Sequence, residues 1–512
     1  MSPDPDTSGL AVLAETQTRL PLLIVSAILA VLAYPTVNWH LLIWISLVPV
    51  LCCALSRTPR QALADGWLNG VVFFTLLLRW LDHTFRTYSA IPWPLTWLPI
   101  LGLAGYCGLY TGLVAAGVSW LSRRLGPGLG LAAAPFLWIS GEWVRGHLLS
   151  GFPWGLLGYS QAFVLPVIQI SEWTGVYGVS FLIASVNAAL TGAVALDWRR
   201  AVGGLAGAAA LLLASLGFGW QSFTRAAEGS LPVAVVQPSI DQTGKWDLTT
   251  LTQTLELYQQ LTLEAGRSAP ALVIWPETAV PLFLRQDSAT LERLRLLSAR
   301  VGAPLVLGAV DAEPGTTRRY FNSAFFVTGE GIGAKYDKIH LVPFGEYVPL
   351  STLLGFVRGW AAFISEFDSG TVRAVFPLRE APFGVVICYE GLFPELFREF
   401  VAEGARFMVN MTNDAWFGET SGPWQHLAVL PFRAVENRVA IARAANTGVS
   451  AVIEPSGRIR RTLGLFRRGI VEDRLPERTR TTFYTRRGDA FAYACLGLSL
   501  AVLGWARFGR AA

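Results

Sequence analysis

The sequence predicts a polytopic α-helical membrane protein with an inserted α/β domain, and three observations lead to this fold class. The chain of 512 residues is 52% hydrophobic and only 15% charged, whereas soluble chains are about 25% charged. Long apolar segments fill most of the chain before residue 222 and recur near its C-terminus. Between them, 222–487 alternates short β-branched runs with helical patterns. This hydrophobicity excludes a disordered chain, and a net charge of +5 without a dense basic stripe argues against nucleic-acid binding.

Eight segments are apolar enough to cross a bilayer, which takes about 20 mostly apolar residues. Seven of them precede the α/β domain and one follows it. The sequence is therefore divided into a seven-span region at 1–221, a domain at 222–487, and a last span with its tail at 488–512. The predicted spans are 20–36, 39–55, 64–80, 95–120, 127–145, 163–195, 201–220 and 489–506.

Arginine pairs mark every second loop between these spans and set the predicted orientation. By the positive-inside rule, loops that carry such pairs face the cytoplasm. The N-terminus is then cytoplasmic, and seven crossings place the α/β domain outside. The last span returns the C-terminus to the cytoplasm. The pairs are Arg57 and Arg60, Arg123 and Arg124, and Arg199 and Arg200.

Three ionisable residues, Glu142, Arg145 and Glu172, fall in or beside the predicted spans. Charged groups at membrane depth are costly unless they pair or contact water. We therefore expect them to pair or to line a wet cavity. Most of the tryptophans nearby are typical of an aromatic belt at the membrane interface.

Residues 222–487 are predicted to form one α/β domain. Strand-length apolar runs alternate with helical patterns, which indicates strands with helices packed outside them. The expected strands are 231–237, 271–275, 304–310, 323–328, 384–388, 406–411 and 449–454. The expected helices are 248–265, 289–300 and 424–443.

The apolar run 348–367 does not fit this alternation. Proline and glycine interrupt it, and it is too irregular to be a span. It is either a core helix of the domain or a mobile arm that dips into the outer leaflet, as apolar interfacial segments do. We favour the arm.

Cys388 is the only cysteine of the α/β domain, because the other four lie in predicted spans. A disulfide within the domain is therefore impossible. Cys388 ends the apolar run 384–387 and is followed by Tyr389, Glu390 and Gly391. A side chain at the end of a strand and just before a glycine is well placed to be presented in a pocket.

Lysine is rare in this chain, which has three lysines, Lys245, Lys335 and Lys338, while arginine supplies the other positive charges. Arginine would serve for a surface charge but not for a compact point charge beside a nucleophile. We single out Lys338 on this ground and take the other two as solvated surface residues.

Glu277 follows the predicted strand 271–275 and Pro276. Proline cannot continue a central strand, so the strand ends there. Glu277 then projects at the carboxyl edge of the sheet, where α/β proteins tend to bind ligands.

Cys388, Lys338 and Glu277 could carry out one reaction together. A thiol needs a base or a nearby positive charge to become a thiolate. Glu277 can take the proton of Cys388, and Lys338 can favour the thiolate and stabilise an oxyanion. A Cys–His pair using His340 or His426 is the rival arrangement. Two more carboxylates lie near these residues in sequence and could hold the lysine or tune the base: Glu346 and Glu390.

The motifs around these residues resemble those of the nitrilase superfamily. Trp275-Pro276-Glu277, the segment around Lys338, and Ile387-Cys388-Tyr389-Glu390 are similar to its Glu–Lys–Cys triad in that chain order, and 413–418 is similar to a further motif. The resemblance implies an α-β-β-α sandwich. A nitrilase-like domain set between seven spans and a last one resembles the membrane-embedded apolipoprotein N-acyltransferase family over nearly the whole chain.

This resemblance implies a role for each matching residue. Glu277 would be the general base, Lys338 the oxyanion stabiliser and Cys388 the nucleophile. Supporting residues would be Glu346, Glu390 and the backbone N–H of Tyr389. Substrate-binding residues would be Trp246, Trp416, Trp154, Arg145 and Asn322. No metal and no cofactor is implied.

The resemblance also implies an activity. A phospholipid, typically phosphatidylethanolamine, would give its sn-1 acyl chain to the N-terminal amine of a diacylglyceryl-cysteine apolipoprotein, through a cysteine thioester and with ping-pong kinetics. The enzyme would lie in a bacterial inner membrane as a monomer, with its catalytic domain in the periplasm. Two rivals stay open. One is a tethered hydrolase of small amides, and the other is a transporter whose outer domain only binds.

Overall fold

The structure is a computed structural model that describes residues 16–223, 229–242, 248–313, 319–349, 366–379, 381–476, 478 and 480–509. The chain forms two compact units. The helical unit consists of Met1–Leu81, Pro94–Thr224 and Arg487–Ala512, and the α/β unit consists of Asp82–Trp93 and Arg225–Arg486. The segment Asp82–Trp93 therefore belongs to the α/β unit, although the sequence-based division placed it in the helical region.

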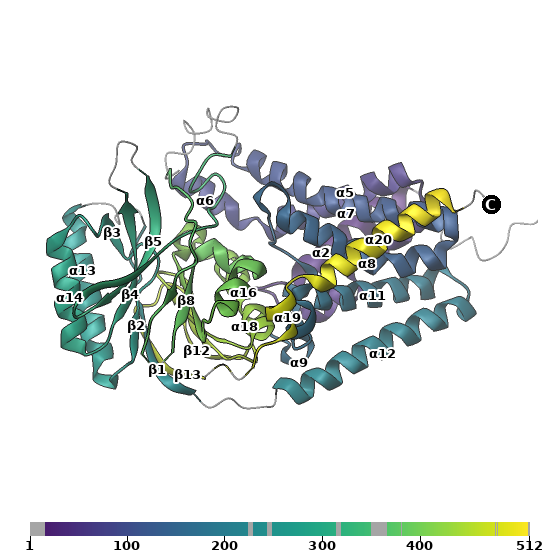
Figure 1. The fold of residues 1–512 in the computed structure, drawn as a ribbon. Helices are drawn as coiled ribbons and strands as arrows, with labels where there is room; N and C mark the ends of the chain where they lie inside the picture. The colour runs from purple at the N-terminus through teal and green to yellow at the C-terminus, as the bar shows by residue number, and fades with distance from the viewer. Residues whose placement is uncertain are drawn as a thin grey trace, which may run out of the picture. The chain divides into compact units, whose positions relative to one another are not determined.

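Each of the eight predicted spans contains at least one helix (Figure 1). The predicted span 163–195 is not one helix, because α9 and α10 are single turns and Gly175, at a φ of 64°, precedes α11. The helices are α2 (Thr16–Leu32), α3 (Ile43–Ser46), α4 (Val48–Ser56), α5 (Pro59–Leu77), α6 (Trp80–Tyr88), α7 (Trp97–Leu125), α8 (Pro127–His147), α9 (Leu165–Ile168), α10 (Ser171–Thr174), α11 (Val176–Ala195), α12 (Trp198–Phe223) and α20 (Ala490–Phe508).

Among the described residues, four helices are both long and apolar enough to cross a bilayer: Trp97–Leu125, Val176–Ala195, Ala201–Phe223 and Ala490–Phe508. The bent pair α5 and α6 would make a fifth. Large apolar side chains stay exposed on α12 and α20, as expected of helices that face lipid rather than water. They include Leu211, Leu213, Trp220, Leu498, Leu500 and Trp505. The eight-span topology remains a prediction.

Small residues let α5 and α7 approach closely. A Cβ added at Gly70 of α5 would lie 2.6 Å from the Cα of Gly108 on α7, and one added at Gly112 would lie 2.7 Å from the carbonyl oxygen of Leu63. Gly66 and Gly70, like Gly108 and Gly112, stand four residues apart. This is the small-residue spacing that brings membrane helices into backbone contact.

The α/β unit contains two sheets. The first has the strand order β13-β1-β2-β4-β5-β6, with β3 paired to β4, and the second has the order β12-β11-β10-β9-β8-β7. The strands are β1 (Gly229–Gln237), β2 (Leu272–Ile274), β3 (Val280–Phe283), β4 (Leu305–Ala312), β5 (Tyr320–Thr328), β6 (Gly331–Asp337), β7 (Val375–Phe376), β8 (Phe383–Ile387), β9 (Phe407–Thr412), β10 (Ala440–Ala445), β11 (Ser450–Ile453), β12 (Ile459–Leu463) and β13 (Gly469–Pro476).

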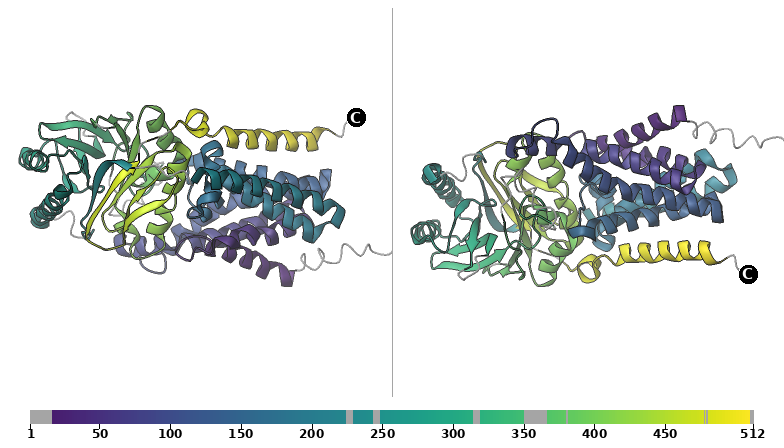
Figure 2. Two further views of the ribbon diagram at one scale, coloured as in Figure 1. Left: turned by 90° about the horizontal axis from the view of Figure 1, so that it is seen from below. Right: turned by 90° about the horizontal axis from the view of Figure 1, so that it is seen from above.

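Helices cover the outer face of each sheet, and the sheets pack against each other through β1, β10, β11 and β13 (Figures 1 and 2). Helices α13 (Leu248–Ala265) and α14 (Ser288–Val301) pack on the first sheet. Helices α16 (Pro394–Ala402) and α18 (Leu430–Asn437) pack on the second. The expected α-β-β-α sandwich is thus confirmed, and buried side chains such as Trp275 and Phe325 fill the layer beneath α13 and α14.

All seven expected strands are present, and the expected helix 424–443 is wrong at its end. Helix α17 (Gly422–Leu427) and helix α18 occupy its first part, but residues 440–443 belong to β10. Arg438 ends α18 in the left-handed conformation. The next residues then pair in parallel with β9, which buries the whole strand. The alanines that favour a helix locally are here a central strand, because sheet pairing outweighs propensity.

Three sequence predictions fall on residues outside the described ones. Trp246 and Lys245 lie in 243–247, and most of the run 348–367 lies in 350–365. The choice between an arm and a core helix for that run stays a prediction.

Candidate active site

Cys388 stands where a buried strand turns sharply into a helical turn. It follows β8 directly, has a φ of 51°, and begins the short 3-10 helix Cys388–Leu392. A positive φ is costly for a residue with a side chain, and such strain is concentrated at functional sites. Thr278, next to Glu277, and Phe344, in the loop after Lys338, share this conformation. All three loops that carry the predicted triad are therefore held in strained conformations.

The amine of Lys338 lies between two carboxylates. Its Nζ is 3.4 Å from Oε1 of Glu277 and 2.9 Å from Oε1 of Glu346, with Oε2 of Glu346 at 2.8 Å. The lysine side chain is 1% exposed. A buried charge needs such partners, because leaving water is otherwise too costly. The structure thus brings Glu277, Lys338 and Glu346 together, as predicted.

A side-chain amide and two backbone N–H groups also donate hydrogen bonds to the carboxylates of Glu277 and Glu346. The side-chain amide of Asn322, on β5, donates to Oε1 of Glu277 at 2.8 Å and to Oε1 of Glu346 at 2.9 Å. The backbone N–H of Asn413 donates to Oε2 of Glu277 at 2.9 Å, and that of Val342 to Oε2 of Glu346 at 2.8 Å. Asn322 therefore lies inside the network of Glu277, Lys338 and Glu346, where it orients both carboxylates.

Glu390 is fully buried and joins two of the active-site loops. Its Oε1 accepts from the hydroxyl of Tyr336 at 2.7 Å and from the backbone N–H groups of Ile339 and His340 at 2.7 and 3.0 Å. Its Oε2 accepts from the N–H of Ile387 at 2.7 Å. Burial raises the pKa of Glu390 to about 7, against the opposing effect of these donors. Glu390 thus ties the loop that follows Lys338 to the strand that precedes Cys388.

Burial is the main reason why the pKa of the Cys388 thiol is raised. Burial, and then the negative charge of Glu277, raise the pKa of Cys388, while Lys338 acts in the opposite direction. Burial lowers the pKa of Lys338, but Glu346 and Glu277 outweigh it and the pKa is raised. At neutral pH the thiol is therefore neutral and the lysine charged. The nucleophile needs a base that takes its proton during attack, and Glu277 is suited to this.

His426 contacts the nucleophile through the carbonyl of Cys388, and His340 stacks on a neighbouring ring. Nε2 of His426, on α17, lies 3.1 Å from the carbonyl oxygen of Cys388, and its Nδ1 lies 3.0 Å from Oδ1 of Asp414. The ring of His340 stacks on Phe393 with centroids 3.5 Å apart. These positions favour the Glu–Lys–Cys arrangement over the rival Cys–His pair.

A second buried charge cluster lies behind the nucleophile and was missed from sequence. Asp414 and Arg443 are fully buried, and Nη2 of Arg443 lies 2.7 Å from Oδ2 of Asp414. The hydroxyl of Thr412 donates to Oδ1 of Asp414 at 2.9 Å. An aspartate inside the 413–418 motif was the available signal, but only the fold shows its partners.

The predicted substrate-binding Trp416 is half-buried and packs within the α/β unit. Its ring contacts that of Tyr88 with centroids 4.7 Å apart, and its carbonyl accepts from Thr84 at 2.8 Å. A Cβ added at Gly418 would lie 2.3 Å from the ring of His83. The segment Asp82–Trp93 therefore contacts the 413–418 motif, in which the backbone N–H of Asn413 donates to Glu277.

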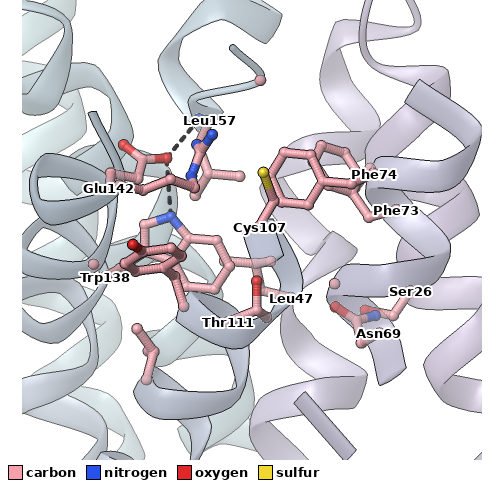
Figure 3. A pocket seen from close by; sticks show the side chains of 17 residues that line it. Ser26, Leu47, Asn69, Phe73, Phe74, Cys107, Thr111, Trp138, Glu142 and Leu157 are labelled. Atoms are coloured by element: carbon pink, nitrogen blue, oxygen red, sulfur yellow. Dashed lines mark hydrogen bonds between the residues drawn. The ribbon is translucent and has the colours of Figure 1, made fainter. Parts of the chain in front are cut away.

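Arg145 and Trp154, also predicted to bind substrate, are buried in the helical unit. Arg145 donates to the carbonyls of Phe152 and Trp154 at 2.7 and 2.6 Å, which fixes the loop after α8. With Glu142 it lines a cavity of about 40 Å³, room for a few waters. Glu142 accepts there from Nε1 of Trp138 at 3.0 Å and from the N–H of Leu157 at 2.7 Å (Figure 3).

Lys335 differs from its expected role as a solvated residue. Its Nζ lies 2.6 Å from Oδ2 of Asp311 and 2.9 Å from Oδ2 of Asp337, and its side chain is 24% exposed. Asp311 also binds Arg285 at 2.7 Å. Lys335 is thus part of an ion-pair network on the first sheet.

Two family models match this chain. The apolipoprotein N-acyltransferase N-terminal domain matches residues 26–189, and carbon-nitrogen hydrolase matches residues 232–483. The apolipoprotein N-acyltransferase of Geobacter metallireducens is 37% identical over 487 residues, with 92% of each chain covered. That of Azotobacter vinelandii is 36% identical, with 89% of this chain and 88% of the relative covered. A solved Nesterenkonia amidase from the nitrilase superfamily has 22% identity and a TM-score of 0.40, covering 52% of this chain and 97% of its own.

Proposed function

Because the chain belongs to the apolipoprotein N-acyltransferase family, we propose that it moves an acyl chain from a phospholipid to the N-terminal amine of diacylglyceryl-cysteine apolipoproteins, through a thioester on Cys388. The observation that carries this proposal is the buried triad. Glu277 and Lys338 are within 3.4 Å of each other, and the charges of both act on the thiol of Cys388. The donor is the sn-1 ester of a phospholipid, typically phosphatidylethanolamine.

The first half-reaction forms the thioester. The sulfur of Cys388 attacks the ester carbonyl carbon while Glu277 takes the thiol proton. The carbonyl becomes a tetrahedral oxyanion, which Lys338 and the backbone N–H of Tyr389 stabilise. The bond to the glycerol oxygen then breaks, Glu277 returns the proton to that oxygen, and the lysophospholipid leaves.

The second half-reaction forms the amide. The neutral N-terminal amine of the acceptor attacks the thioester carbon, and Glu277 takes a proton from the nitrogen. The carbon–sulfur bond then breaks, and the released sulfur recovers a proton to restore the thiol. Two substrates that use one site in turn imply ping-pong kinetics. Burial of the triad limits hydrolysis of the thioester by water.

We place the enzyme in a bacterial inner membrane as a monomer, with the α/β unit in the periplasm. The apolar helices and the arginine distribution support this placement. Trp416, Trp154, Arg145, Asn322 and Trp246 are proposed to position the substrates, directly or through the loops that they hold.

The test of this proposal is the mass of the acyl-enzyme. Detergent-purified protein is incubated with phosphatidylethanolamine, and its intact mass is recorded. We expect an adduct that hydroxylamine releases, that maps to Cys388, and that a diacylated lipopeptide discharges as an N-acyl product. Cys388→Ala should form no adduct, whereas the matched control Cys495→Ala, in α20, should behave as the wild type. If no adduct forms while small amides are hydrolysed, the proposed acyl transfer is wrong and the protein is better explained as a tethered hydrolase of small amides.

A further inference from the structure

The carbonyl of the nucleophile's own peptide is held by a buried histidine. Nε2 of His426 lies 3.1 Å from the carbonyl oxygen of Cys388, and Nδ1 of the same ring lies 3.0 Å from Oδ1 of Asp414. His426 and Asp414 have side chains 1% and 0% exposed. Both side chains have given up their contacts with water, so each polar atom needs a partner inside the protein. A surface histidine has no such need.

The chemistry of its partners assigns a proton to Nε2. A carbonyl oxygen can only accept a hydrogen bond, so Nε2 must donate to it. At the other side of the ring, Nδ1 faces the Asp414 carboxylate and also lies 3.3 Å from Nη2 of Arg443. These are the charged groups that face the ring from neighbouring elements. Whether Nδ1 donates to Asp414 or accepts from Arg443, the N–H at Nε2 points at Cys388.

This hydrogen bond sets the direction of the next N–H group. The peptide between Cys388 and Tyr389 is trans, and in a planar trans peptide the C=O and N–H groups point in opposite directions. Because the carbonyl of Cys388 points at His426, the N–H of Tyr389 points to the opposite side of that peptide. In the proposed reaction this N–H is a donor to the oxyanion.

The strained backbone makes such an anchor necessary. Cys388 has a φ of 51°, a costly conformation for a residue with a side chain, which persists only where its surroundings impose it. The strand before it is held by Glu390, which binds the N–H of Ile387. His426 fixes the peptide that follows Cys388 in the same way, through the Cys388 carbonyl.

We propose that His426 is a positioning residue that fixes the Cys388–Tyr389 peptide so that the Tyr389 N–H is directed at the oxyanion during acylation of Cys388. The inference rests on the proposed acyl-enzyme mechanism. His426 does not take the proton of Cys388, because its ring contacts the carbonyl and Asp414 instead. Asp414 and Arg443 contact Nδ1 of the ring, and Thr412 in turn donates to Asp414.

Two reactions of Cys388 separate this role from a merely structural one. Acylation by an ester passes through an oxyanion, whereas alkylation by iodoacetamide displaces iodide and forms no oxyanion. The test compares both rates in full-length protein in detergent, using phosphatidylethanolamine and the activated ester p-nitrophenyl butyrate as acyl donors. His40→Leu, a histidine change in the helical unit, is the matched control.

His426→Leu should slow acylation by about 10- to 100-fold, since losing an oxyanion donor costs about 100- to 1,000-fold and a misdirected one is expected to cost less. Its rate of alkylation should stay within about threefold of the wild type. His426→Gln carries an N–H near the position of Nε2 and should recover most of the acylation rate. His426→Asn reaches only toward Asp414 and should not. The Gln and Asn pair decides the question if the Leu variant fails to fold.

The remaining outcomes overturn the inference. Equal losses of acylation and alkylation would show that His426 only holds the fold. Unchanged acylation in His426→Leu, or no difference between the Gln and Asn variants, would show that its hydrogen bond to Cys388 does not matter. If wild-type protein reacts with the activated ester but not with phospholipid, the proposed donor is wrong, and the test of His426 still stands on the ester.

Discussion

At the scale of single residues, the site is built from charges that are buried and mutually compensated. Lys338 is bound by two carboxylates, and Asn322 bridges the same two carboxylates. Asp414 is compensated by Arg443. Removing one partner of such a set leaves an unpaired buried charge, which is far more costly than losing a surface ion pair. Each of these residues can therefore be tested by a change that alters charge and little else.

Glu346→Gln should weaken both stability and acylation. Lys338 would keep Glu277 as its one charged partner at 3.4 Å, so the base would be drawn toward the lysine. We expect acylation to fall by about 10- to 100-fold and the free energy of unfolding by roughly 3 kcal/mol, as for other broken buried pairs. Denaturant unfolding and the ester burst measure the two effects. Glu292→Gln, an exposed change on α14, should alter neither.

Asp414 should make the protein sensitive to acid. Burial raises the pKa of Asp414, but the opposing effect of Arg443 and His426 is larger. The pKa is therefore lowered from an ordinary value of 3.8 to about 2. Because the folded pKa is below the unfolded one, this stabilisation is complete above about pH 4 and is lost as pH falls toward 2. The difference corresponds to about 2 kcal/mol. Unfolding of Asp414→Asn should depend less on pH in this range, and an unchanged slope would contradict the assignment.

At the scale of elements, the site lies on loops that leave the sheets, and close backbone contacts set their course. Glu277 follows β2, Lys338 follows β6 and Cys388 follows β8. Gly308 of β4 lies against the first of these loops: a Cβ there would be 2.3 Å from the backbone nitrogen of Thr278 and 2.8 Å from Cα of Glu277. Only glycine leaves room for the loop that carries the base.

Gly308→Ala should therefore displace Glu277 without touching its side chain. A shift of about 1 Å at a catalytic group can cost on the order of 100-fold in rate, so acylation should fall by at least tenfold. Alkylation of Cys388 by iodoacetamide is expected to change less. Gly464→Ala, in the same unit and with open space around its Cβ, is the control. Equal activity of the two variants would show that the loop adapts freely.

At the scale of the whole molecule, the number of crossings decides which side of the membrane the triad faces. The seven predicted crossings before residue 222 would put the α/β unit on the side opposite to the N-terminus, and the arginine pairs predict that this side lies outside the cytoplasm. The five native cysteines are buried, which leaves a low background for cysteine labelling. The side of the membrane on which each unit lies can therefore be measured by labelling single introduced cysteines.

Glu292→Cys, on exposed α14, should react with a membrane-impermeant maleimide in intact spheroplasts. Arg60→Cys, exposed in the first turn of α5 and between the second and third predicted spans, should react only after the membrane is disrupted. Both variants carry Cys388→Ala to remove the nucleophile. Labelling of Arg60→Cys and not of Glu292→Cys in intact spheroplasts would reverse the topology.

How well a structural feature can be predicted from the sequence depends on how far apart in the chain the interacting residues lie. Apolar runs and strand patterns identified the helical region and the strands that precede Cys388 and Glu277, because these patterns lie in consecutive residues. The sandwich was expected from the resemblance to the nitrilase superfamily. The pattern failed at 440–443, where pairing with β9 makes a strand of a helix-prone run. It also missed that Asp82–Trp93 joins the α/β unit.

The fold class could be predicted from the sequence, and so could a set of candidate site residues, since the one cysteine of the α/β domain, the three lysines and a proline-ended strand are visible one residue at a time. Which of these residues come into contact became clear from the three-dimensional fold alone. The pairing of Lys338 with Glu277 joins residues 61 positions apart, and the contact of His426 with the Cys388 carbonyl spans 38. Such contacts arise when strands from distant parts of the chain pack side by side. No local pattern encodes which loops will meet.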